Sequence, residues 1–159
     1  MKVKISVFFL LTIFVVLIFS PTIYNNTSAS DYTNKSNPWK IEDMIEFVFE
    51  KEEGSEININ IFFTINEDFD QYSNFFLFVQ LVNQDSNEKL SVDTLEYEIY
   101  NKYGDCLGSG LSNLKQFQKT YKPKTSYLKS GFYKLEITQG MRETIHGVSN
   151  VGFKIIKDS

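Results

Sequence analysis

The chain has 159 residues, of which 42% are hydrophobic and 16% aromatic, so it can bury the core of one domain and is not disordered throughout. Its formal net charge of −4 leaves no basic footprint for nucleic acid. A single cysteine, Cys106, excludes an internal disulfide.

The first thirty residues have the composition of an export signal. A positively charged start, MKVK, precedes an apolar run over residues 5–19. This run is shorter than the roughly 20 residues of a membrane-spanning helix and fits the apolar region of a signal peptide. The small residues of Ser28-Ala29-Ser30 would permit cleavage before Asp31. We therefore predict a signal peptide or an N-terminal hydrophobic anchor over residues 1–30.

Strand-like alternation dominates the remainder of the chain. EININIFFTI, residues 56–65, has isoleucine or phenylalanine at every odd position, which indicates a half-buried strand. The continuously apolar run over residues 74–82 indicates a strand covered on both faces. Seven strands are predicted, over residues 45–50, 57–65, 74–82, 94–100, 117–122, 133–137 and 151–155. Short strands with Gly- and Asn-rich turns predict an all-β fold, an antiparallel β-sandwich of about seven strands over residues 39–159, after a flexible tether over residues 31–38.

Catalytic groups do not gather into a recognisable pattern. His146 and Cys106 are the sole histidine and thiol, and no sequence feature brings them within the hydrogen-bond reach that nucleophilic catalysis needs. Glu96 and Glu98 stand about 7 Å apart along a strand, a separation that glycoside hydrolysis can use. Their alternation with apolar neighbours explains them equally as the wet side of a sheet. We therefore predict no enzyme and no catalytic residue.

Two further residue groups have a possible binding role. Glu67, Asp68 and Asp70 cluster after a strand, but they lack the further acids and the glycine of an EF-hand calcium loop, so we predict no metal and no cofactor. Three aromatic residues fall on the outward register of their segments: Phe62, Tyr100 and Phe132. They could pack under loops or line an exposed sugar-binding patch, which leaves an exported carbohydrate-binding β-sandwich module as the alternative function.

Three stretches together are similar to a known family. They are YSNFFLFVQL (72–81), DTLEYEIYNKYGDCLGSGLSNL (93–114) and GFYKLEITQGMRETIHGVSNVGFKI (131–155). In order and spacing they resemble the gliding-motility lipoprotein family GldH of Bacteroidetes, over residues 39–156. The family-like turn residues are Gly104, Leu107, Gly108 and Gly110 in the second stretch, and Gly140, Met141 and Arg142 in the third.

The resemblance implies a non-enzymatic protein of the cell envelope, either on the periplasmic face of the outer membrane or anchored in a membrane. It further implies a role in gliding motility machinery linked to type IX protein secretion, with other gliding and secretion envelope proteins as partners. We interpret residues 139–146 as a structured connector and possible docking surface. Gly140 would allow a turn with positive φ, Met141 would fill a gap, and Arg142 would offer its planar donors to a neighbouring loop.

One departure from the family concerns membrane attachment. Members carry a lipobox whose cysteine receives the lipid, and the corresponding stretch here is Leu17-Ile18-Phe19-Ser20. A serine hydroxyl cannot form the thioether. We therefore expect an exported protein that associates with the membrane through its N-terminus or through a partner, or that is released.

Overall fold

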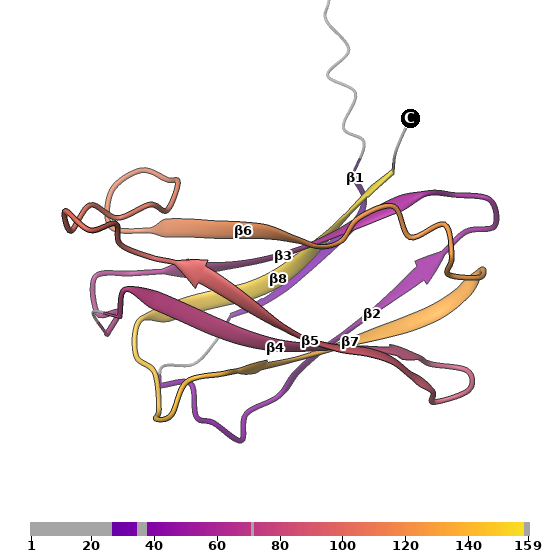
Figure 1. The fold of residues 1–159 in the computed structure, drawn as a ribbon, viewed down its shortest axis with the longest axis horizontal. Helices are drawn as coiled ribbons and strands as arrows, with labels where there is room; N and C mark the ends of the chain where they lie inside the picture. Colours follow the sequence, from indigo (N-terminus) through magenta and orange to yellow (C-terminus); the bar gives the residue numbers. More distant parts are fainter. Residues whose placement is uncertain (1–26, 35–37, 71, 158–159) are drawn as a thin grey trace, which may run out of the picture.

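The computed structural model describes residues 27–34, 38–70 and 72–157. Two four-stranded antiparallel sheets face each other (Figure 1), which confirms the predicted all-β sandwich, with eight strands. The first sheet is ordered β1 (Thr27–Asn34), β8 (Val148–Lys157), β3 (Ile57–Ile65) and β6 (Lys115–Lys122). The second sheet is ordered β2 (Ile45–Lys51), β7 (Gly131–Gln139), β4 (Asn74–Asn83) and β5 (Lys89–Glu98). Across the described ranges, the search for a helix able to cross a membrane finds none.

Strand β1 corrects the predicted tether. Residues 31–34 continue β1 and pair with residues 150–153 of β8, so the tether does not begin at Asp31. This edge strand escaped prediction because its residues are polar, and an edge strand can be held by backbone hydrogen bonds alone. A cut before Asp31 would fall inside β1. The apolar run over residues 5–19 lies outside the described residues.

Strand β5 begins earlier than the predicted residue 94. It pairs with β4 from Lys89 onward, although Leu90 and Val92 are exposed. Residues 89–93 lack the buried apolar alternation on which the prediction depended, because β5 is a sheet edge and shares only part of its length with the core.

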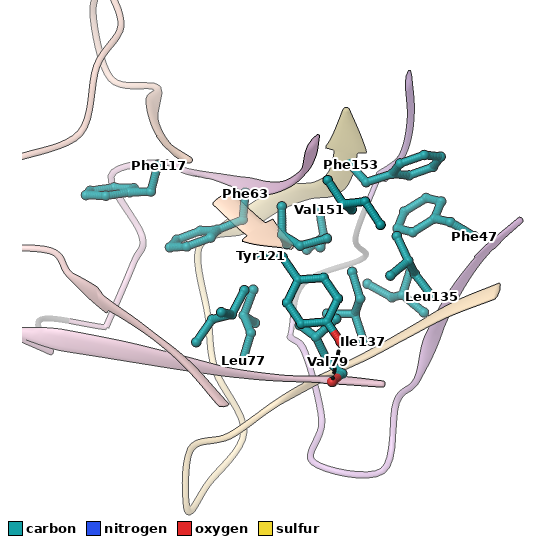
Figure 2. Packing of buried hydrophobic residues seen from close by; sticks show 14 of the residues in the cluster. Phe47, Phe63, Leu77, Val79, Phe117, Tyr121, Leu135, Ile137, Val151 and Phe153 are labelled. Atoms are coloured by element: carbon teal, nitrogen blue, oxygen red, sulfur yellow. Dashed lines mark hydrogen bonds between the residues drawn. The ribbon is translucent and has the colours of Figure 1, made fainter. Parts of the chain in front are cut away.

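The core fills the space between the two sheets. Figure 2 shows side chains from both sheets pointing toward one another, including Phe63, Leu77, Val79 and Val151. The Phe63 ring contacts one ring of its own sheet and two of the opposite sheet, with centroid separations of 4.9–5.3 Å for Tyr97, Phe75 and Phe117. Such aromatic pairs add about 0.5–1.5 kcal/mol each beyond their area burial.

Side chains join the two sheets where their edge strands β5 and β6 approach each other. Tyr121 Oη donates to the Val79 carbonyl at 3.4 Å (Figure 2) and to Asp93 at 3.0 Å. Lys122 Nζ also reaches Asp93, at 2.7 Å. Partial burial raises the pKa of Asp93, but the hydrogen bonds from Lys122, Tyr121 and Ser91 outweigh it and the pKa is lowered. The β5–β6 side of the sandwich is thereby closed by polar contacts.

Candidate functional site

Residues 140–147, the connector from β7 to β8, are held by two distant segments. The backbone nitrogens and carbonyls of Trp39 and Ile145 exchange hydrogen bonds of 2.7 and 2.9 Å, and both side chains are fully buried. The Gly147 carbonyl accepts from Asn66 N at 2.8 Å. The connector is therefore part of the folded core at this end of the sandwich.

A buried amide organises the start of the connector. Gln139 is almost fully buried, and its side chain accepts from Met141 N at 2.6 Å and donates to the Glu143 carbonyl at 2.8 Å. The Glu143 carboxylate accepts a hydrogen bond from the Tyr72 hydroxyl, and this bond raises the pKa of Tyr72. Met141 is partly buried against the core.

Gly140 and Arg142 differ from expectation. Gly140 does not adopt a positive φ; it is tightly packed instead, since a Cβ there would lie 3.0 Å from Phe76 Cβ and 3.3 Å from the Phe76 carbonyl oxygen. Arg142 is exposed. Within the described part of the chain, its guanidinium makes no hydrogen bond or ion pair, so the expected contact with a neighbouring loop is not formed there.

His146 ties the connector to the turn after β3. Its backbone nitrogen donates to Asp70 at 2.6 Å, and its ring Nδ1 lies 3.3 Å from the same carboxylate oxygen. Cys106 instead bridges through its backbone to Tyr100 and packs against the core. The contacts of His146 therefore join two loops, whereas the backbone bridge of Cys106 stays within the connection between β5 and β6.

The second family-like region lies in the connection between β5 and β6. The Asn101 side chain accepts from Tyr103 N at 2.9 Å and from Asp105 N at 3.0 Å. Gly104 has a φ of +86°, which places a glycine where an L side chain would be strained. The hydrogen bonds of the Asn101 side chain stabilise this turn locally, between residues 101 and 105.

The following segment, residues 107–114, is fixed by a small ladder. Ser109 and Gln116 exchange backbone hydrogen bonds of 2.9 and 2.7 Å. Gly108 packs against β6, and a Cβ there would lie 2.7 Å from the Phe117 ring. Gly110 has a φ of +134°, and a Cβ there would lie 2.5 Å from the Leu114 carbonyl oxygen. Both glycines are needed for this backbone path.

The same segment presents leucines to solvent, and we call it the leucine loop, defined by Leu107, Leu111 and Leu114. Their exposed fractions are 48%, 92% and 51%. Figure 1 shows the β5–β6 connection projecting past the start of β6 at one end of the sandwich. Grouped apolar side chains on a fixed backbone are typical of a recognition surface.

Sequence reasoning identified Leu107 and the glycines of this loop but missed Leu111 and Leu114. A usable signal was present, because large apolar residues within the turn-rich stretch GSGLSNL have no strand register to bury them. Their exposure, 92% for Leu111 and 51% for Leu114, could be decided only by the path of the loop.

The acidic residues considered as candidate binding or catalytic groups make separate contacts. Glu67 accepts from Asn113 Nδ2 at 2.8 Å, and Glu96 accepts from Asn74 Nδ2 at 2.5 Å. Glu96 and Glu98 are both exposed on β5, as expected for the solvent side of a sheet. Over the residues whose positions are described, no group of three His, Cys, Asp or Glu side chains could hold a metal ion.

The three outward aromatic residues do not form a sugar-binding platform. Phe62 is buried, with Lys154 Nζ 5.3 Å from its ring centroid. Tyr100 is partly buried against the core, and Phe132 lies on β7 in the other sheet and is half exposed. The geometry gives the carbohydrate-binding alternative no support.

Comparison with known proteins gives a coherent family assignment. The model of the GldH lipoprotein family matches residues 25–155. The chain belongs to the GldH lipoprotein family. It is 28% identical over 166 residues to a "Gliding motility lipoprotein GldH homolog" from Christiangramia forsetii, covering 99% of this chain and 98% of the relative. It is 33% identical over 92 residues to "Gliding motility lipoprotein GldH" from Flavobacterium johnsoniae, covering 53% of this chain and 55% of that protein.

Solved structures add little to this GldH assignment. The subviral particle of infectious bursal disease virus VP2 aligns with 81% of this chain and 32% of its own, at 12% identity and a TM-score of 0.40. A likeness at that level carries no inference about function.

Proposed function

We propose that this GldH family member is a non-enzymatic cell-envelope component of gliding motility machinery linked to type IX protein secretion, and that it acts by protein–protein contacts. Family membership supports the role in motility, since two relatives are named gliding motility lipoproteins. We place the protein on the periplasmic face of the outer membrane or in a membrane-anchored position, associated through its N-terminus or through a partner. Its sole cysteine, Cys106, packs against the sandwich core, so we do not assign it as a lipid-attachment residue.

The leucine loop is the observation that carries the contact role. Leu111 is 92% exposed although the backbone around it is fixed by the ladder between Ser109 and Gln116. Holding such a side chain in water forgoes about 1.5–3 kcal/mol that its burial would contribute. A partner that covers it would gain this burial, and the bridge between Ser109 and Gln116 closes the loop that presents it.

Substitution of the loop leucines tests the proposal directly. We expect Leu111→Glu to reduce crosslinked capture of envelope gliding and secretion proteins from native membranes by tenfold or more, because a carboxylate would be buried at the contact. Purified protein should keep its free energy of unfolding within about 0.5 kcal/mol, as is usual for a surface substitution. Capture is measured by quantitative mass spectrometry after crosslinking in cells.

The matched control is Tyr127→Glu. Tyr127 is also strongly exposed, but it lies in the connection between β6 and β7, at the opposite end of the sandwich in Figure 1. Capture should survive in this variant. If both variants capture the same proteins as the wild type, the leucine loop is not the contact; if the wild type itself captures no gliding or secretion protein, the proposed function is wrong.

A further inference from the structure

A lysine occupies a core position at the end of β2. Strand β2 alternates buried and exposed residues along its length, and Lys51 closes the buried series that begins at Ile45. Lys51 is only 3% exposed, whereas lysine is almost never fully buried without a partner. It faces Gly131 of β7 across the sheet.

Lys51 is poorly satisfied by the residues around it. Its ammonium has three hydrogens to donate, and among the described residues it makes one long hydrogen bond, of 3.4 Å, to the Glu52 carbonyl. The same residues offer it no ion pair within 4 Å. The Glu52 carboxylate itself is paired with Lys157 at 2.7 Å. An anion that approaches this ammonium would therefore not have to displace a carboxylate of the described residues.

Lys51 lines a pocket at this end of the sandwich. The pocket has a volume of about 490 Å³, within the range of small-ligand sites. Two serine hydroxyls that can donate to an anion, those of Ser126 and Ser130, line the same pocket. Ser55 lines it as well, but its hydroxyl donates to the Glu52 carbonyl at 2.8 Å. The lining thus combines the connection between β2 and β3, that between β6 and β7, and the end of β2.

The charges that line the pocket indicate which anion fits. Lys51 and Lys129 are balanced by the exposed Glu53 and Glu56. A dianion such as phosphate would be repelled by both glutamates, and the lining has no arginine to bind its oxygens in pairs. A monoanionic carboxylate requires one ammonium and one or two hydroxyl donors, which the lining supplies.

We propose that this pocket binds a carboxylate group, with the Lys51 ammonium as its counter-charge and the serine hydroxyls as hydrogen-bond donors. The carboxylate belongs either to a small organic acid or to an acidic side chain of a peptide. The site is distinct from the leucine loop and does not depend on the proposed function. A purely structural role is the competing explanation, in which the apolar stem of Lys51 covers the end of the core.

The Lys51→Met variant distinguishes the binding role from the structural role, because it retains the unbranched stem and removes the charge. The full-length protein is purified in detergent, and its melting temperature is measured with sodium acetate, a blocked Ala-Glu-Ala peptide, sodium phosphate and sodium chloride at equal ionic strength. Wild type should be stabilised by a carboxylate beyond the chloride response. Lys51→Met should be at least as stable without ligand and should bind the carboxylate at least tenfold more weakly by calorimetric titration.

Two control variants keep the outcome clear. Lys129→Met removes the exposed lysine of the same pocket and should retain most of the response, while Lys51→Gln serves if the methionine variant does not fold. A response to acetate supports a small acid as the source, and a response to the peptide alone supports an acidic peptide. Equal stabilisation of wild type and Lys51→Met, a phosphate response larger than the carboxylate response, or no response beyond chloride would each overturn the proposal.

Discussion

The connector at residues 140–147 and the leucine loop at residues 107–114 carry comparable sequence signals but have opposite structural characters. The connector is inserted into the domain: Ile145 is fully buried and exchanges backbone hydrogen bonds with Trp39. The leucine loop is held by the backbone bridge between Ser109 and Gln116 and by Asn113, which donates to Glu67, and it exposes apolar side chains. A family-like turn can thus serve the fold in one place and present a surface in another, and burial decides which.

The largest effect should come from Gly147→Ala in the connector. Gly147 has a φ of +75°, and a Cβ there would stand 2.1 Å from the backbone nitrogen of Phe69. Because backbone cannot rotate away as a side chain can, we expect the free energy of unfolding to fall by about 3–5 kcal/mol, measured by denaturant unfolding. Gly54→Ala is the control, since Gly54 has a φ of +70° with open space around it and should cost about 1–2 kcal/mol. Equal losses would show that the connector is not locked against the Phe69 turn.

A smaller loss is expected for Gly108→Ala in the leucine loop. Its Cβ would meet the Phe117 ring and Lys115 Cβ at 2.7 Å; the ring can shift, and Lys115 Cβ can move only with the backbone at the start of β6. We expect a decrease of about 1–3 kcal/mol in the free energy of unfolding, together with displaced backbone amide signals in residues 107–114 by nuclear magnetic resonance. A loss as large as that of Gly147→Ala would mean that the leucine loop is as deeply built into the fold as the connector.

The smallest effect on stability is expected for Arg142→Ala. Arg142 is exposed, so the free energy of unfolding should change by no more than about 0.5 kcal/mol. Ile145→Ala, three residues along and fully buried, should cost about 2–5 kcal/mol. Crosslinked capture tests whether Arg142 nevertheless contacts a partner. A stability loss near that of Ile145→Ala would show that the guanidinium supports the fold.

The candidate surfaces were less predictable than the strands, for reasons visible in individual residues. Gly140 could be identified as a special position, but its role is close packing against Phe76, which depends on a strand more than sixty residues earlier in the chain. Leu111 was readable as an apolar residue in a turn, but its exposure depends on where the turn projects. Lys51 lies one residue beyond the strand predicted over residues 45–50, and only the structure shows that it ends β2 and is buried.

The sequence by itself determined the all-β class and the core strands. Alternation along residues such as 57–65 predicts which side chains are buried, and this prediction does not depend on which residues they pack against. The family pattern was equally readable, since it is a property of residue order. Tertiary structure alone decided that β1 joins the first sheet, since backbone pairing with β8 leaves no apolar signature. It also decided which of two similar turns is buried and which is exposed, because burial depends on contacts between segments far apart in the chain.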